Sequence, residues 1–217
     1  GVLIDDLITK GVDEPYRMFT SRAEYRILLR QDNADQRLTP IGYSIGLADE
    51  SRIKKMESKK ENIERLIHFI KTNNALPEEV NKSFEELNTP IITQKTKLSQ
   101  LLLRPQVNLD ILKNNVPYLN AEINKTPTEI KSQVEECAEI LVKYESYIKK
   151  EEEIVSKLSH FENLVIKDDF DYHSLKSLSF EAREKLSKIR PKTIGQAGRI
   201  SGVSPADISV LVIYISR

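Results

Sequence analysis

TPTEIKSQVEECAEILVKYESYIKKEEEIVSKL, residues 126–158, is the stretch that decides the fold. Its apolar residues recur at alternating intervals of three and four, with one skip at Glu151: Ile130, Val134, Cys137, Leu141, Tyr144, Ile148, Val155 and Leu158. This heptad pattern is typical of a helix with one apolar face. Thr126-Pro127 gives a start signal, because proline is favoured at the first helical position. We predict one long helix that either packs within a bundle or forms a coiled coil with a partner.

The composition of the whole chain also favours helices. Only 7 of 217 residues are glycine, none is tryptophan, and 30% are charged, with lysine, glutamate, leucine and isoleucine abundant. These residues are good helix formers. The sequence therefore predicts a mainly α protein, a multi-helix bundle with one long helix and a small C-terminal subdomain of three helices.

Start signals and prolines divide the remainder of the chain. Thr39-Pro40 predicts a short helix to about residue 47, and Asp49 precedes a helix to about Thr72. Prolines then separate shorter helices between residues 73 and 126. Residues 21–30 fit a helix or a strand, and a helix is favoured because Ser21 and Glu24 form a capping-box pattern.

An acidic, polar linker is expected at residues 163–171, followed by helices near 180–188, 193–200 and 204–216. We accordingly divide the chain into 1–17, the end of a preceding domain, 18–162, a helical domain, and 163–217, a small helical subdomain. GVLI at residues 1–4 is typical of the inside of a strand, and the first residue is not methionine. We therefore expect the chain to be part of a longer protein.

The sequence holds no complete active site. Cys137 is the only cysteine, which fits a reducing compartment such as the cytoplasm and excludes a disulfide within the chain. The three histidines lie far apart, so no metal site is expected, and no glycine-rich phosphate loop is found. The longest apolar run, residues 210–215, is too short to span a membrane.

EPYRMFTSRAEYR, residues 14–26, concentrates the groups that bind nucleic acid. Four arginines lie four or five residues apart, at Arg17, Arg22, Arg26 and Arg30, with Tyr16 and Tyr25 among them. Guanidinium groups bind phosphates and tyrosines stack on unpaired bases. The chain has 33 basic and 33 acidic residues, but residues 17–60 hold ten basic against six acidic ones. The alternative is that neighbouring carboxylates neutralise these arginines within the protein.

The C-terminal helices have the spacing of a helix-turn-helix, but their last helix, DISVLVIYI at residues 207–215, is too apolar to read a DNA groove. No DNA is therefore expected as a ligand. This helix is either buried or docks on another protein, and the candidate docking residues are Ile208, Leu211, Val212 and Ile215. Basic residues before it, including Arg190, Lys192 and Arg199, are candidates for contacts with RNA phosphates.

Three stretches resemble the MnmG (GidA) family: residues 1–47 with the EPYR run and DNAD at 32–35, VKYESYI at 142–148, and IGQAGRISGVSPADIS at 194–209. The resemblance implies a C-terminal helical region that holds tRNA and contacts the GTPase MnmE. It also implies a homodimer whose other part binds FAD and uses NADH to modify C5 of the tRNA wobble uridine with a carboxymethylaminomethyl or aminomethyl group. The resemblance also implies that Arg17 and Arg26 hold tRNA. We extend this role to Arg22 and Arg30, because Arg22, Arg26 and Arg30 lie four residues apart and so share one face of a helix or of a strand.

This chain lacks the FAD fingerprint and the redox cysteines of the family, so no cofactor is expected within it. We do not expect the chain alone to catalyse a reaction. The rival hypothesis is a purely structural module that serves dimerisation, with its arginines used in internal ion pairs.

Overall fold

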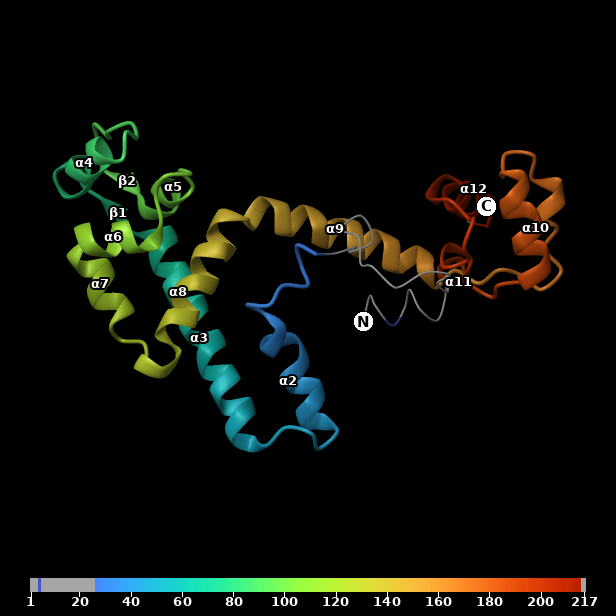
Figure 1. The fold of residues 1–217 in the computed structure, drawn as a ribbon, viewed down its shortest axis with the longest axis horizontal. Coiled ribbons are helices and arrows are strands. Elements are labelled where there is room, and N and C mark those ends of the chain that lie inside the picture. Colours follow the sequence, from blue (N-terminus) through green and yellow to red (C-terminus); the bar gives the residue numbers. More distant parts are fainter. Residues whose placement is uncertain (1–3, 5–25, 216–217) are drawn as a thin grey trace, which may run out of the picture. The chain divides into compact units, whose positions relative to one another are not determined.

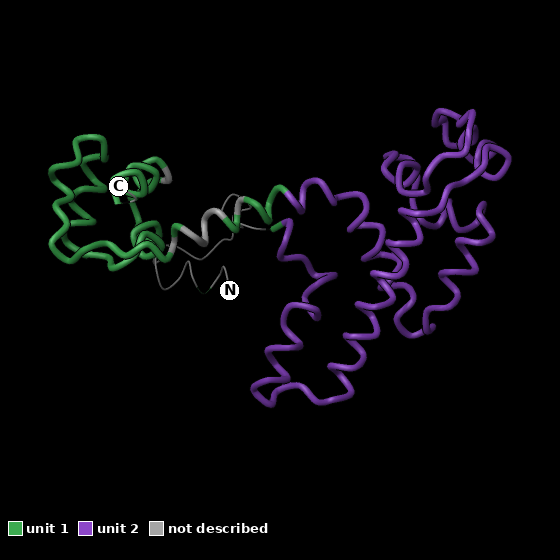
Figure 2. Tube along the Cα trace, turned by 180° about the vertical axis from the view of Figure 1, so that it is seen from behind, with its two compact units in different colours: residues 1–26, 150–217 green, residues 27–149 purple. Residues whose placement is uncertain are grey.

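The structure is a computed structural model that describes Ile4 and residues 26–215 (Figure 1). It divides into two compact units (Figure 2). We call residues 27–149 the bundle unit and residues 150–217 the C-terminal unit, with which residues 1–26 are grouped. The predicted mainly α fold class is confirmed, because the described residues form helices joined by short connections and a single two-stranded sheet.

The bundle unit consists of short helices around one long one. Its elements are α2 Ala34–Ser44, α3 Glu50–Thr72, β1 Asn74–Ala75, α4 Pro77–Glu86, β2 Thr96–Lys97, α5 Leu98–Leu102, α6 Leu109–Asn115, α7 Pro117–Ile123, α8 Thr128–Lys143 and the start of α9 Glu145–Glu162. The strands are antiparallel, with Asn74 opposite Lys97. As predicted, Asp49 caps α3, since its side chain accepts a hydrogen bond from the backbone N–H of Arg52.

The core of the bundle unit lies mainly between α3 and α8 and is closed by α4 to α7. Ile63, Leu66 and Ile70 of α3 are buried, as are Val134 and Ala138 of α8. Fully burying a valine, leucine or isoleucine side chain contributes about 1.5–3 kcal/mol. The heptad face of α8 therefore packs within the bundle of its own chain, which was one of the two predicted alternatives.

The predicted long helix over residues 126–158 is two helices. α8 ends at Lys143, Tyr144 leaves the helical conformation with φ −105° and ψ 11°, and α9 begins at Glu145. The break comes just after Val142, which is buried in the core. Tyr144 and Tyr147, which follow it, are exposed and do not contribute to the core. Among the described residues the longest helix is instead α3, with 23 residues.

Two local predictions near the N-terminus differ from the structure. The helix expected to start at Pro40 already starts at Ala34, so Pro40 lies inside α2. Ala34, Gln36 and Arg37 favour helix, and Asp35 complements the positive end of the helix dipole, so these residues extend the helix upstream. Residues 26–30 form turns and a bend, where a helix was favoured, and residues 21–25 lie outside the described part.

The C-terminal unit contains the three predicted helices, α10 Phe180–Ile189, α11 Ile194–Gly198 and α12 Pro205–Ile215, and a 3-10 turn at Tyr172–Ser174. Its core includes Tyr172, Leu186 and Leu211. The expected linker contributes to this core: Ile166 is buried and donates its backbone N–H to the Lys192 carbonyl at 2.8 Å. Among the described residues, no helix has both the length and the apolar character needed to cross a bilayer.

Candidate nucleic-acid interface

The structure describes two of the four predicted tRNA-binding arginines. Arg17 and Arg22 lie outside the described residues. Arg26 is exposed to solvent, whereas Arg30 is partly buried. The two described arginines therefore differ in their availability to a ligand.

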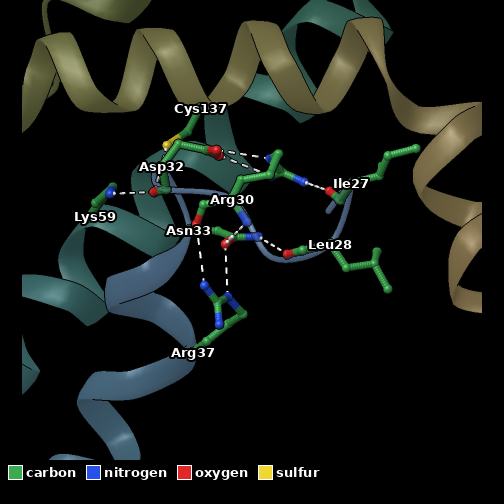
Figure 3. A network of polar contacts seen from close by, with 8 residues as sticks. All are labelled: Ile27, Leu28, Arg30, Asp32, Asn33, Arg37, Lys59 and Cys137. Carbon is green, nitrogen blue, oxygen red and sulfur yellow. Dashed lines mark hydrogen bonds and ion pairs between the residues drawn. The ribbon is translucent and has the colours of Figure 1, made fainter. Parts of the chain in front are cut away.

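Arg30 is bound within its own loop (Figure 3). Its Nε donates to Asp32 Oδ1 at 2.9 Å and its second terminal nitrogen to Asp32 Oδ2 at 3.0 Å, which makes a two-pronged ion pair. Its other terminal nitrogen donates to the Ile27 carbonyl at 2.7 Å. Such pairs fix the plane of the guanidinium group. At Arg30 the structure thus shows the internal pairing that the rival hypothesis expects.

Asn33 holds the same loop in place from its centre. Its Oδ1 accepts from the backbone N–H of Arg30 at 3.2 Å and from Arg37 Nε at 2.9 Å, and its Nδ2 donates to the Leu28 carbonyl at 2.8 Å. Arg37 also donates to the Arg30 carbonyl at 3.3 Å. The loop from residue 27 to 33 is therefore linked to the first turn of α2 (Figure 3).

Lys59 of α3 anchors this loop to the bundle. The lysine is 5% exposed, and its Nζ donates to the Asp32 carbonyl at 3.0 Å and to Asp35 Oδ2 at 2.8 Å. The thiol of Cys137 of α8 donates to the same Asp32 carbonyl at 3.4 Å (Figure 3). The carboxylates of Asp32 and Asp35 are thus used as structural ion-pair partners.

Cys137 is a buried structural residue in this arrangement. Burial raises the pKa of its thiol to about 11, which outweighs the opposite effect of the nearby Lys59 charge. Since the thiolate is the reactive form of cysteine, this residue is not an activated nucleophile at neutral pH. Over the described part of the chain, no three histidine, cysteine, aspartate or glutamate residues cluster as metal ligands would.

The candidate docking residues of α12 turn mainly towards the core of their own unit. Leu211 is completely buried, and Ile208, Val212 and Ile215 are partly buried against the same core. The large apolar side chains that α12 exposes are Ile213, at 56%, and Tyr214. A partner at this helix would therefore meet Ile213 and Tyr214 first.

The basic residues before α12 also differ from one another. Arg190 donates to the carbonyls of Asp168 and Phe170, at 3.1 and 2.9 Å, and its guanidinium group lies over the Tyr172 ring. It is thus held against the core of the C-terminal unit. All three residues are exposed, but the guanidinium group of Arg190 is already engaged in these contacts.

Sequence reasoning missed two residues that organise the polar structure. Lys59 occupies a position in the 56–59–63–66–70 series, whose other members are all apolar and buried. A lysine at such a position signals a buried polar contact. Asp207 follows Ser204 by three residues, which is capping-box spacing with aspartate in place of glutamate, and it binds both Ser204 and Ser179.

Comparison with known proteins finds a family match for each of the two units. Residues 50–152 match the family described as tRNA modifying enzyme MnmG/GidA C-terminal helical domain, and residues 154–217 match its C-terminal helical bundle. These matches place the chain in the class of C-terminal helical regions whose family is described as a tRNA modifying enzyme.

Relatives and solved structures agree with this class. The tRNA uridine 5-carboxymethylaminomethyl modification enzymes MnmG of Parabacteroides distasonis and Cytophaga hutchinsonii are 52% and 54% identical over the whole chain. The alignments cover 35% and 34% of those proteins, so the chain spans about a third of their length. A crystal structure of Aquifex aeolicus GidA aligns with the whole of this chain, with a TM-score of 0.69 and 38% sequence identity. The alignment covers 32% of the GidA chain. The chain belongs to the MnmG/GidA family and corresponds to its C-terminal helical region.

Proposed function

We propose that this chain is the tRNA-holding region of an enzyme that adds a carboxymethylaminomethyl or aminomethyl group to C5 of the wobble uridine in tRNA. The observation that carries the proposal is the similarity over the whole chain to proteins named for this modification. The proposed protein is cytoplasmic and homodimeric and acts with the GTPase MnmE. FAD and the site of NADH oxidation belong to the part of the enzyme that lies outside this chain.

Arg26 supports the tRNA-binding role within the described residues, because it is exposed and follows Tyr25 in the basic run. Arg17 and Arg22 remain predictions for the same role. Arg30 is proposed to stabilise the loop that follows Arg26, since three of its nitrogen atoms already donate within that loop. An exposed guanidinium group that follows a tyrosine in the sequence suits both a phosphate and the face of an unpaired base.

Replacing Arg26 by alanine is expected to weaken tRNA binding by the full-length enzyme about 5- to 30-fold, the loss of one phosphate or stacking contact. The measurement is a titration of labelled tRNA at low and at physiological salt. The slope of log affinity against log salt should fall by about one. Arg26→Lys is the control that keeps the charge, so it should retain the slope. Unchanged affinity and unchanged slope in Arg26→Ala would contradict the role of this residue.

The same titration with the 217-residue chain alone separates the two parts of the proposal. Binding with a steep salt dependence would support tRNA contacts made by this chain itself. If tRNA binds the full-length enzyme but not this chain even at low salt, the rival hypothesis of a structural module is favoured.

MnmE is proposed to dock on the C-terminal unit through the exposed side of α12. Ile213→Glu in the full-length enzyme should reduce MnmE binding about tenfold, because it places a charge in an apolar contact. Binding is measured with purified MnmE by biolayer interferometry. Ile189→Glu is a matched control, since Ile189 lies on α10 of the same unit and is 55% exposed, against 56% for Ile213. Equal binding by the two variants would refute docking at this side of α12.

A further inference from the structure

α2 exposes an apolar stripe to solvent. Leu38, Ile41 and Ile45 are 58%, 59% and 64% exposed. Leu38 and Ile41 lie on α2 with spacing i and i+3, and Ile45, which caps it, follows at i+7, so all three lie along one face. We call these three residues the α2 stripe. Leu47 follows just beyond the helix and is 82% exposed, which extends the apolar surface.

A neighbouring side of α2, which carries Asp35 and Thr39 four positions apart, contacts the bundle. Asp35 pairs with Lys59 of α3, and Thr39 is the buried residue of the helix. α2 and α3 contact each other directly (Figure 1).

This arrangement is the reverse of an amphipathic helix that packs on its own core, which buries its apolar face and exposes its polar one. The ion pair of Lys59 and the hydrogen bonds of Asn33 hold α2 with its apolar stripe facing outward. An apolar face that is held outward in this way marks an interaction surface.

The family match indicates which surface covers the stripe. The C-terminal helical domain of the family begins at residue 50, so α2 precedes that domain. About two thirds of the length of the relatives lies outside the matched region, and the matched domains are described as C-terminal. We propose that in the full-length polypeptide the α2 stripe packs against the part of the same chain that precedes the helical domains, and so joins the two parts of the enzyme.

A surface of this size fits a tethered partner better than a free one. Stable complexes between separate proteins bury about 800 Å² on each side, which is more than one face of an 11-residue helix provides. A covalently linked domain is present at a millimolar effective concentration, so a small apolar contact is enough to hold it. A second copy of the chain would lack this advantage.

Maleimide labelling of introduced cysteines tests the proposal, with each site resolved by mass spectrometry. Ile41→Cys reports on the stripe. Ile91→Cys is the matched control, because Ile91 is 50% exposed in the bundle unit and lies outside α2. Both variants are made in the 217-residue chain and in the full-length enzyme. Ile41→Cys should label at least tenfold more slowly in the full-length enzyme than in the chain alone, and Ile91→Cys should change less than twofold.

Two outcomes would overturn the proposal. Equally fast labelling of Ile41→Cys in both proteins would show that the stripe stays open in the full-length enzyme. Slow labelling in the chain alone that accelerates on dilution would show that a second copy covers the stripe. Neither outcome depends on tRNA binding, so the proposed function is tested separately.

Discussion

Lys59→Met is expected to lower the free energy of unfolding of the bundle unit by about 1.5–3 kcal/mol, the range for hydrogen bonds to a charged group. Methionine keeps the aliphatic stem of the side chain but removes the ammonium group, so the loss reports the polar contacts. Those contacts are the Asp32 carbonyl at 3.0 Å and the Asp35 carboxylate at 2.8 Å. Asp35 is 37% exposed and regains water when the lysine is removed, which places the loss below that of a fully buried ion pair.

The measurement combines urea unfolding with hydrogen exchange of residues 30–44. Exchange should accelerate there first, because Lys59 of α3 holds both the loop, through the Asp32 carbonyl, and α2, through the Asp35 carboxylate. Lys60→Met is the matched control: the side chain of Lys60 is 59% exposed, and its ion pair with Glu64 is 4.0 Å long. Exposed pairs of this kind contribute about 0–1 kcal/mol. Equal unfolding curves for the two variants would show that the Lys59 contacts add no net stability.

Sequence patterns predicted the elements whose signals are local. Asp49 and the apolar spacing behind it located α3 to within a residue or two, since a cap and an amphipathic face are both written in neighbouring residues. The heptad positions of α8 likewise identified core residues such as Val134. Where the core ends, that pattern stops being informative, and the break at Tyr144 was missed for this reason.

The candidate site was harder to predict, because composition does not show which charged groups pair with one another and some of the contacts join distant parts of the chain. Charge and aromatic content singled out the basic run, but they could not distinguish the exposed Arg26 from Arg30, which is paired with Asp32. Lys59 and Asp35 meet across 24 positions of sequence. The outward apolar face of α2 was equally hidden, because periodicity shows that a helix has an apolar face and not whether its own chain covers that face.

Asp207 is expected to be the most sensitive residue of the C-terminal unit. It is 4% exposed, and its carboxylate accepts the backbone N–H groups of Ser179 at 2.8 Å and Ser204 at 2.9 Å. It also accepts both serine hydroxyls, at 3.3 and 2.6 Å. Ser179 caps α10 and Ser204 precedes α12, so this one side chain ties together the starts of two helices.

Asp207→Ala should therefore lower the free energy of unfolding of the C-terminal unit by about 1–3 kcal/mol, because it removes the acceptor that the donors at two helix starts share. The measurement is the urea dependence of hydrogen exchange in α10 and α12. Asp171→Ala is the matched control: that carboxylate caps only the 3-10 turn at Tyr172–Ser174, through a backbone contact at 3.0 Å. Asp171→Ala should lower the free energy of unfolding by less than half as much as Asp207→Ala does. An equal decrease for the two variants would contradict the bridging role of Asp207.

The stability that Asp207 provides should also depend on pH. Burial by itself would raise the pKa of this carboxyl, but the hydrogen bonds from Ser179 and Ser204 outweigh burial and hold its pKa below the usual 3.8. The unfolded chain consequently binds the proton more tightly than the folded one. The contribution of the Asp207 carboxylate to the free energy of unfolding is thus complete above about pH 4 and is lost as the pH falls through the lowered folded pKa.

An Asp207→Asn variant tests this pH dependence, because asparagine cannot titrate. The difference in the free energy of unfolding between the native protein and this variant should shrink over that acid range and stay constant from pH 5 to 7. A difference that is the same at pH 3 and pH 7 would show that the ionised carboxylate is not the form that stabilises the two helix starts.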